Sequence, residues 1–484
     1  MKGYKDLTTG SPFKNILFFC IPIFIGNIFQ QLYSMVDTII VGQTISLDAL
    51  AAVGCTGSVN FLILGFISGV CSGFGVLIAQ FYGAGDEENV RRSVGTSYVL
   101  CIAVTAVVTA VAVATAMPLL KLMRTDSAII GDAYDYIIVI FWGIGATTLY
   151  NMASCMLRAI GDSRAPLYFL IFASLLNIGL DYLCILVFRM GVAGAGVATV
   201  LSQLVSGVLC LLYALKKYKI LRTRRRHFWT NALFGWKHLK VGLPMALQFS
   251  ITAIGVMVVQ SVLNTMGTDT VAAYTAASKI DSIAQQPFVA IGAAIATYCA
   301  QNYGAKQYGR IKKGMNIGLL LTVIFSAAGF LLILLLKKPL ILLFAGEDYA
   351  RIYDNAAMYL YINAGTYLLL GLIFLYRNGI QGMGFSAVTM LAGGAELVMR
   401  IVAALIFARY WGYIGVCSAN PAAWFGADVI LVIVYAVLAK KSIPTAKTPK
   451  RKHHSPFEDR EIARNSERKQ SNFDCFCNFC HEFL

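Results

Sequence analysis

The sequence predicts an all-α integral membrane protein whose twelve transmembrane helices form two parallel-repeat six-helix bundles around a central cleft. Three observations support this fold class. The composition is 58% hydrophobic and only 13% charged, the apolar residues gather into twelve long stretches, and the second half of the chain repeats motifs of the first. Soluble domains carry about a quarter charged residues, so this chain has too little charge for a soluble protein.

Each apolar stretch is long enough to cross a bilayer, which takes about 20 mostly apolar residues. The stretches lie near residues 16–42, 49–81, 93–118, 129–156, 166–188, 192–215, 241–265, 271–302, 315–336, 354–381, 386–408 and 413–438. Those longer than about 25 residues predict tilted helices. The first stretch is long enough to span, so we expect it to be the first helix and not a cleaved leader.

The positive charge of the chain is best explained by membrane topology. The formal net charge is +16. With both termini in the cytoplasm, about 31 of the 40 Lys and Arg fall in inner segments, which is the bias that orients membrane proteins. Arg158, Arg164 and Arg377 are among the residues assigned to that side. We therefore expect a multi-pass monomer in the lipid bilayer of the plasma (bacterial inner) membrane, with no nucleic-acid partner.

The internal repeat has an offset of about 221 residues. Residues 79–84 read AQFYGA and residues 300–305 read AQNYGA, near the ends of the second and eighth spans. Pro22 and Pro244 also match, which predicts local bending in the first and seventh helices. Each half has six spans, an even number, so the halves are parallel repeats related by an axis along the membrane normal.

The repeat divides the chain into four parts. We expect an N-lobe with helices 1–6 at 1–215, a basic cytoplasmic connector at 216–240, a C-lobe with helices 7–12 at 241–439 and a disordered basic tail at 440–484. The tail holds the metal-binding residue types Cys475, Cys477, Cys480 and His481. A second CxxC pair beside Cys477 and Cys480 is missing there, so no metal site is predicted.

Ionisable groups inside spans are costly, which makes them the first candidates for function. Asp37 in the first span and Asp181 in the fifth both lie about five to seven residues before the outer helix end, at a depth of roughly 8–10 Å. Asn177 precedes Asp181 by one helical turn, so both project from one face. Thr199 enters at a similar depth from the sixth span, and Asn151 lies deeper on the fourth.

Two carboxylates that share a dry site cannot both be ionised cheaply. Such a pair can hold a proton, or it can accept Na⁺ with Asn and Thr oxygens completing the ligand shell, because hard cations prefer oxygen. The alternative is that the two acids line a watery cavity without acting together.

The second half lacks this acid pair. Positions matching Asp37 fall at 258–260, and positions matching Asp181 fall at 402–404, all without an acidic residue. Glu396 and Arg400 are spaced i,i+4, which predicts an internal ion pair. Lys279 and Asp281, two residues apart, are expected on different helix faces.

Several side chains in the spans could form a soft wall of the cleft for flat cationic compounds. The candidates are Tyr33, Met35, Met152, Met257, Gln260, Tyr274, Lys279, Phe288 and Tyr367. No nucleotide-binding loop of the Walker type occurs in the sequence. We therefore expect neither an enzyme nor a cofactor beyond the coupling ion, H⁺ or Na⁺.

Several runs of the chain resemble the multidrug and toxic compound extrusion family. They are residues 36–42 (VDTIIVG), 51–54 (AAVG), 157–163 (LRAIGDS), 194–199 (GAGVAT) and 301–305 (QNYGA). The resemblance covers about residues 13–438 and excludes the tail.

The resemblance implies twelve helices in two lobes and export of small organic cations in exchange for H⁺ or Na⁺. It implies an N-lobe cation site at Asp37, Asn177, Asp181 and Thr199, together with Asn151. Some members use acids in the seventh and tenth helices; apart from Asp354 at the very start of the tenth, this sequence has none in those spans, which favours the N-lobe mechanism.

Two other functions remain open at this point. A flippase of a lipid-linked precursor would share the architecture but would favour a strongly cationic cavity for pyrophosphate. A non-transporting membrane sensor would need no coupling site.

Overall fold

A computed structural model describes residues 6–123, 125–229, 231–345 and 349–442. The four Cys and His residues of the tail, and the tail from residue 443 onward, lie outside this part of the chain. Every regular element within it is helical. This is the physical expectation for apolar segments in lipid, where a backbone without water must satisfy its own polar groups.

The N-lobe helices follow the first six predicted spans in order. They are α1 Pro12–Thr44, α2 Leu47–Gly83, α3 Glu87–Leu122, α4 Ile130–Trp142, α5 Ile144–Ala159, α6 Arg164–Tyr182 and α7 Gly191–Lys217. α4 and α5 form one span with a bend of 48°. The bend lies at Gly143, whose Cβ, if present, would lie 2.1 Å from Val200 Cγ2 on α7.

The C-lobe helices follow the last six predicted spans in order. They are α8 Ala232–Leu263, α9 Thr268–Ala284, α10 Gln286–Gly304, α11 Tyr308–Ala345, α12 Tyr349–Ala364, α13 Tyr367–Gly382, α14 Ser386–Val402, α15 Ala408–Trp411, α16 Tyr413–Cys417 and α17 Ala419–Ser442. The described residues contain ten helical segments able to span a membrane, or twelve if each of the two bent pairs is one span. The predicted number and order of spans are therefore confirmed.

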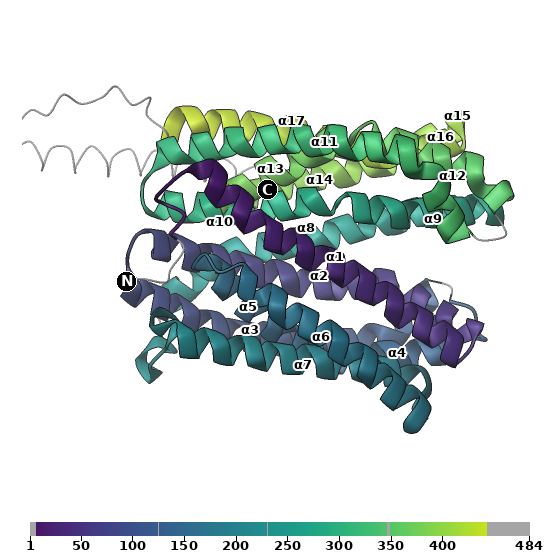
Figure 1. Ribbon diagram of the computed structural model, residues 1–484, viewed down its shortest axis with the longest axis horizontal. Helices are drawn as coiled ribbons and strands as arrows, with labels where there is room; N and C mark the ends of the chain where they lie inside the picture. The colour runs from purple at the N-terminus through teal and green to yellow at the C-terminus, as the bar shows by residue number, and fades with distance from the viewer. Residues whose placement is uncertain (1–5, 124, 230, 346–348, 443–484) are drawn as a thin grey trace, which may run out of the picture. The chain divides into compact units, whose positions relative to one another are not determined.

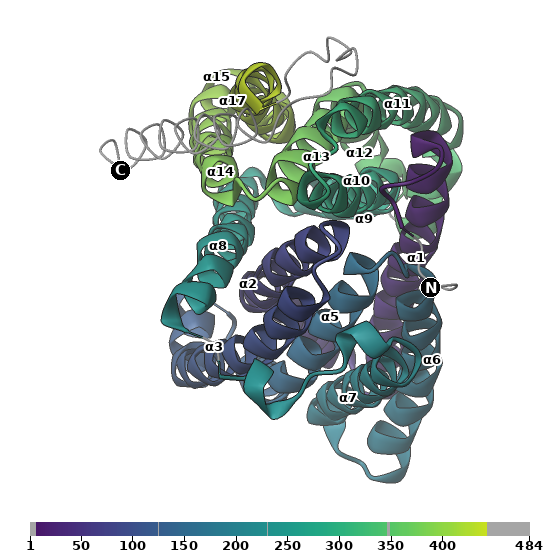
Figure 2. The same ribbon diagram turned by 90° about the vertical axis from the view of Figure 1, so that its left-hand side faces the viewer.

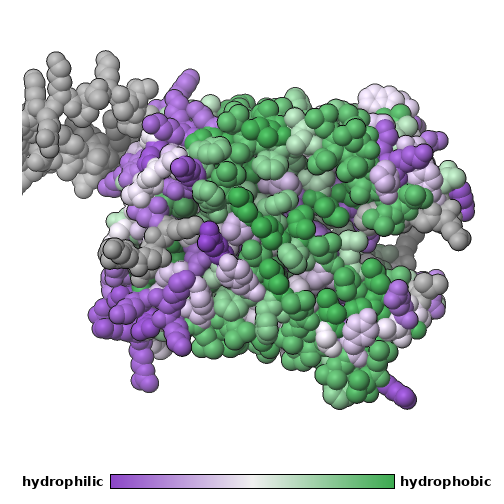
Figure 3. Space-filling model, viewed as in Figure 1, coloured by the Kyte–Doolittle hydropathy of each residue, from purple (hydrophilic) through white to green (hydrophobic). Residues whose placement is uncertain are grey.

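The helices lie side by side along one direction (Figure 1) and separate into two groups when viewed along that direction (Figure 2). α2–α7 lie in one group and α9–α17 in the other, while α1 and α8 run between them: α1 packs on α6 and α10, and α8 on α2 and α14. Hydrophobic side chains form a wide belt between two hydrophilic ends on the face shown in Figure 3. Such a belt is what the hydrocarbon core of a bilayer requires, so it agrees with the integral membrane fold class.

The two lobes meet along α2 and α8, where small residues let the backbones touch. A Cβ on Gly73 would lie 2.5 Å from Gly242 Cα, and one on Gly69 would lie 2.5 Å from Ala246 Cα. Close packing of small residues is how membrane helices associate without a hydrophobic driving force.

The repeated AQxYGA motif joins the lobes at the predicted inner end. Gln80 Nε2 of α2 donates to Gly382 O at 2.9 Å, and Gln301 Nε2 of α10 donates to Ala159 O at 2.7 Å. Gly382 and Ala159 are the last residues of α13 and α5, whose terminal carbonyls lack helical partners. Each lobe thus caps a helix of the other.

The two motif glycines bring these helices together. A Cβ on Gly83 would lie 2.0 Å from Gln301 O, and one on Gly304 would lie 1.8 Å from Gln80 O. We call Gln80, Gly83, Gln301 and Gly304 the inner clasp. It holds the predicted inner ends of the two lobes in contact in this structure.

The two sharpest bends lie away from the repeat-matched prolines. Pro22 and Pro244 lie inside α1 and α8, which continue through them as single helices. The marked bends instead fall at Gly143 and between α12 and α13, where the angle is 46°. Bends at matching places in the two lobes show that the repeat extends to helix geometry.

The connector is shorter than predicted. α7 ends at Lys217 and α8 begins at Ala232, so only residues 218–231 join the lobes. This segment holds two short 3₁₀ turns and packs on α3, where a Cβ on Gly95 would lie 2.4 Å from His227 O.

The inner clasp predicts that Gly304→Ala is destabilising. The added methyl group would collide with backbone, and relieving the collision requires moving α2 from α10, at a cost of about 1–3 kcal/mol. We expect a lower Tm for the purified protein. Gly309→Ala is the matched control, because a Cβ there has no heavy atom within 4 Å. Equal unfolding temperatures for the two variants would contradict the role of the clasp.

Candidate functional site

The structure brings Asp37 and Asp181 together inside the N-lobe. Asp37 lies on α1 and Asp181 on α6, and their side chains are within hydrogen-bonding reach of each other. The residues are 8% and 0% exposed. Neither carboxyl oxygen of Asp181 has a conventional donor among the described residues. The two acids are therefore each other's main polar neighbours.

Local helix structure explains why the two acids meet. Asp37 lies seven residues before the end of α1, and Asp181 lies six residues before the end of the π-helical turn Leu183–Val187 that extends α6. Their depths in the bundle therefore match, as the residue count predicted. π-Helical turns often occur at functional positions because they change the direction of neighbouring side chains. The C-lobe has a matching turn at Ala403–Phe407, but the residue two positions before it, where Asp181 stands in the N-lobe, is Ile401.

Asn177 lies on α6, one turn before Asp181, and Thr199 lies on α7. Both line a narrow space bounded by α1, α6 and α7, together with Tyr33 and Gln203. Asn177 is 2% exposed, and neither atom of its amide group has a hydrogen-bond partner in the described structure. Tyr33 hydrogen-bonds with Gln203. The sequence interpretation missed Gln203, since a glutamine in a span carries no charge to draw attention.

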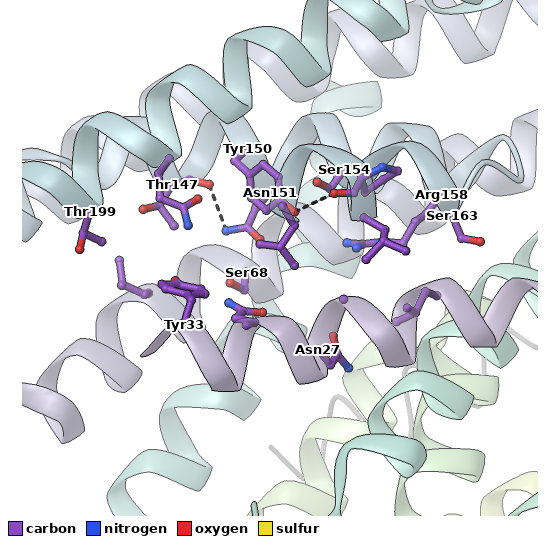
Figure 4. A pocket seen from close by; sticks show the side chains of 18 of the residues that line it. Asn27, Tyr33, Ser68, Thr147, Tyr150, Asn151, Ser154, Arg158, Ser163 and Thr199 are labelled. Atoms are coloured by element: carbon purple, nitrogen blue, oxygen red, sulfur yellow. Dashed lines mark hydrogen bonds between the residues drawn. The ribbon is translucent and has the colours of Figure 1, made fainter. Parts of the chain in front are cut away.

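A larger cavity continues from this space through the N-lobe toward its predicted inner end. It measures about 230 Å³ and is bounded by α1, α2 and α4–α7. Figure 4 shows Thr199 at one end, Asn151 near the middle, and Arg158 and Ser163 at the other end. Asn151 Nδ2 donates to Thr147 O at 3.0 Å, so Asn151 belongs to the larger cavity and not to the space beside Asn177.

The C-lobe interior contains a charge cluster in place of an acid pair. Arg400 Nη2 lies 3.0 Å from Glu396 Oε1, which confirms the predicted ion pair. Arg377 Nη2 lies 2.6 Å from the other oxygen, Glu396 Oε2. Assigning Arg377 to the charges of an inner segment was wrong, because its side chain is only 12% exposed and pairs inside the C-lobe.

The C-lobe has two further buried acids: Asp428 on α17, whose carboxyl oxygens have no hydrogen-bond partner among the described residues, and Asp281. Asp281 accepts hydrogen bonds from Tyr367 Oη at 2.7 Å, Gln285 Nε2 at 2.7 Å and Tyr359 Oη at 3.2 Å. Lys279 is exposed, so it and Asp281 lie on different helix faces as predicted. Tyr367 and Tyr359 come from two other helices, which is why sequence spacing did not reveal this cluster.

The other candidates for the cleft wall are scattered. Met152, Phe288 and Tyr367 are at most 1% exposed and pack in the interior. Tyr274 packs edge-on against Tyr359, with ring centroids 4.8 Å apart, and Gln260 Nε2 donates to Asn264 Oδ1 at 2.8 Å. Met35 and Met257 are partly buried, and neither is among the residues that line the N-lobe cavity. Of the candidates, Tyr33 lines this cavity.

Comparisons with known proteins agree with the fold and with the twofold repeat. The model of the MatE family matches residues 22–183 and 244–406, once in each lobe. The chain belongs to the MatE family. This confirms the resemblance to multidrug and toxic compound extrusion proteins that the sequence motifs indicated.

The MatE relatives cover most of the chain. The probable multidrug resistance protein YpnP of Bacillus subtilis is 30% identical over 385 residues, which is 79% of this chain and 85% of that protein. The probable multidrug resistance protein YoeA of the same organism is 28% identical over 368 residues, which is 75% of this chain and 79% of that protein. The fold is similar to that in a crystal structure of MATE in complex with MaL6, with a TM-score of 0.81 and 25% sequence identity. The match covers 91% of this chain and all of that chain. This MatE protein is therefore a membrane transporter.

The C-lobe charge cluster predicts strong dependence on Glu396. Glu396→Gln would leave Arg377 and Arg400 buried without their carboxylate, which costs about 3–5 kcal/mol. We expect poor folding yield and a markedly lower Tm. The matched control is Glu87→Gln, because Glu87 pairs with Arg91 at the surface, where such pairs contribute about 1 kcal/mol or less. Wild-type stability of Glu396→Gln would disprove the structural role of the cluster.

Proposed function

We propose that this MatE transporter is a secondary antiporter that exports small organic cations in exchange for H⁺ or Na⁺. The contact between Asp37 and Asp181 carries the proposal. Two carboxylates held together in a buried site repel each other unless a proton or another cation is bound between them. The site therefore has the chemistry needed to take up and release a coupling ion.

The direct approach of the two carboxyl groups favours H⁺. A proton can bridge two carboxyl oxygens within hydrogen-bonding reach, whereas Na⁺ requires a shell of several oxygen ligands around it. Asn177, one helical turn before Asp181, and Thr199, which lines the same space as Asn177, are the oxygen donors that we propose for such a shell. The choice of ion is therefore a matter for experiment.

Alternating access provides the means of coupling. The inner clasp joins the predicted inner ends of the lobes in this structure, so opening toward the cytoplasm requires its hydrogen bonds to separate. Binding of the ion changes the charge between α1 and α6, and α1 also packs against the C-lobe helix α10. Ion binding can then bias the lobes toward one conformation through α1, which is how a ligand shifts a two-state equilibrium.

The acid pair predicts that Asp37→Asn and Asp181→Asn each abolish resistance to toxic organic cations in cells. An amide cannot take up and release a proton, so the coupling step is lost. Growth in the presence of ethidium, with expression checked by immunoblot, measures the effect. Asp135→Asn is the control, because Asp135 is exposed on α4 of the same lobe and should leave resistance unchanged. Normal resistance in both acid variants would refute the mechanism.

Imposed gradients in proteoliposomes identify the ion. We expect dye export driven by a pH gradient, acid on the side to which the dye is exported, and abolished by Asp181→Asn. Export driven only by a Na⁺ gradient would assign Na⁺ in place of H⁺. Export under neither gradient would exclude the antiporter, and loss of cell-wall precursor translocation on deletion would then favour the flippase.

A further inference from the structure

An open groove lies on the outer surface of α7, where the connector leaves this helix. It measures about 800 Å³ and is separate from the N-lobe cavity, since the two have no lining residue in common. The connector lies across the predicted inner end of the N-lobe, between α7 and α3 (Figure 2). We call this space the connector groove, and its main lining residues are Phe169, Leu209, Leu212, Tyr213, Lys216 and Arg222.

The part of the groove away from the connector is apolar. Leu209 and Leu212 are exposed on α7, two turns and one turn before Lys216. Seven residues of helix separate Leu209 from Lys216, a rise of about 10 Å. Exposed leucines at this depth belong to the hydrophobic belt, which faces acyl chains in a bilayer. In a membrane, this part of the groove is therefore a place for an acyl chain.

The middle of the groove is ordered by contacts within the N-lobe. The ring of Tyr213 packs edge-on against Phe169, with centroids 5.5 Å apart, and Lys217 Nζ lies 4.8 Å from the centroid of the Tyr213 ring. Lys217 Nζ also lies 3.8 Å from Asp162 Oδ2. The charge of Lys217 is thus used inside the protein, and Lys217 is not among the residues that line the groove.

The connector end of the groove has two cations of a different kind. Arg222 Nε donates to Leu215 O at 2.7 Å and Arg222 Nη2 donates to Lys216 O at 3.0 Å, carbonyls in the last turn of α7 that lack helical partners. These bonds fix the guanidinium and leave Nη1 without an acceptor among the described residues. Neither Arg222 nor Lys216 belongs to an ion pair in the described part of the chain.

The charge of the groove is complementary to an anionic headgroup. The described residues that line it include no Asp or Glu, so nothing in the lining balances Lys216 and Arg222. Both cations lie at the end of the helix, where the hydrophobic belt gives way to the headgroup region. Basic pockets at the cytoplasmic side of membrane helices bind anionic lipid headgroups. A neutral lipid would match only the apolar part of the groove.

We propose that the connector groove binds an anionic phospholipid from the leaflet at the predicted inner end of the helices. Lys216 Nζ and Arg222 Nη1 contact the phosphate of its headgroup, and one acyl chain lies along Leu209 and Leu212. The lipid contacts both α7 and the segment that links the two lobes. This inference concerns the lipid-facing surface and does not depend on the proposed exchange of ions and organic cations.

Two photoactivatable lipids that differ in headgroup charge test the proposal. The full-length protein is reconstituted into vesicles that contain phosphatidylglycerol with a diazirine on one acyl chain, or phosphatidylcholine with the same chain. After irradiation, peptide mass spectrometry measures lipid labelling of residues 209–216. The ratio of phosphatidylglycerol to phosphatidylcholine labelling isolates the effect of the headgroup charge. We expect a wild-type ratio above about ten, because each of the two basic residues favours the anionic lipid about fivefold.

Replacing both Lys216 and Arg222 by Gln should lower this ratio to near one. Replacing both Lys219 and Arg225 by Gln is the matched control, since it removes the same charge from exposed connector residues that do not line the groove. The control ratio should stay close to the wild-type value. Because Arg222 also caps α7, Lys216→Gln alone serves as a second variant, and we expect it to lower the ratio about fivefold.

Three outcomes would overturn the proposal. The first is equal labelling by the two lipids in the wild-type protein, which would mean that the groove takes any lipid. The second is an unchanged ratio in both groove variants. The third is an equal fall in the groove and control double variants, since only the total charge of the connector would then matter. No gradient or transported compound is present, so failure of the antiport proposal would leave this result unaffected.

Discussion

The low dielectric of a membrane interior decides which charged side chains this protein can carry inside it. A buried charge is stable only when it is paired, hydrogen-bonded or neutralised by a proton. In the C-lobe, Glu396 meets two arginines and Asp281 meets two tyrosines and a glutamine. In the N-lobe, Asp37 and Asp181 have chiefly each other. The helices that bring these groups together are therefore constrained by charge as much as by packing.

The internal repeat gives the two lobes similar helix arrangements, and the buried charges are placed within them. α2 and α10 contribute equivalent residues to the inner clasp, and their glutamines cap the equivalent ends of α13 and α5, so one motif serves twice at a single interface. Matching bends and matching π-helical turns follow from the same ancestry of the halves. Because the clasp uses glycine and glutamine and carries no charge, separating it exposes no unpaired ion. That suits a contact which must open and close during transport.

Much of the fold could be predicted from the sequence, since hydrophobic length and repeat offset depend only on local order along the chain. Asp37 and Asp181 could also be paired by counting residues from the helix ends, because depth in a membrane helix is proportional to residue number. The partners of Asp281 and Arg377 could not be predicted. They come from other helices, and no local sequence pattern defines how each helix is rotated about its own axis. Arg158 shows the same difficulty. Charge bias assigned it to the inner side, but only packing of α1, α5 and α6 reveals that it lines a cavity.

The contrast between the buried charges of the two lobes gives a physical reason for placing the proposed ion-binding site in the N-lobe. Glu396 and its two arginines are held by direct contacts, and moving any one of them would leave a buried charge without its partner. The C-lobe cluster therefore resists rearrangement and suits a rigid support. The N-lobe acids have no cationic partner among the salt bridges of the described residues, and Tyr33, one turn before Asp37, lines a cavity. The two repeated halves thus differ in their buried charges: Glu396 is neutralised by two arginines in one lobe, and the proposed cation site would make the other lobe responsive.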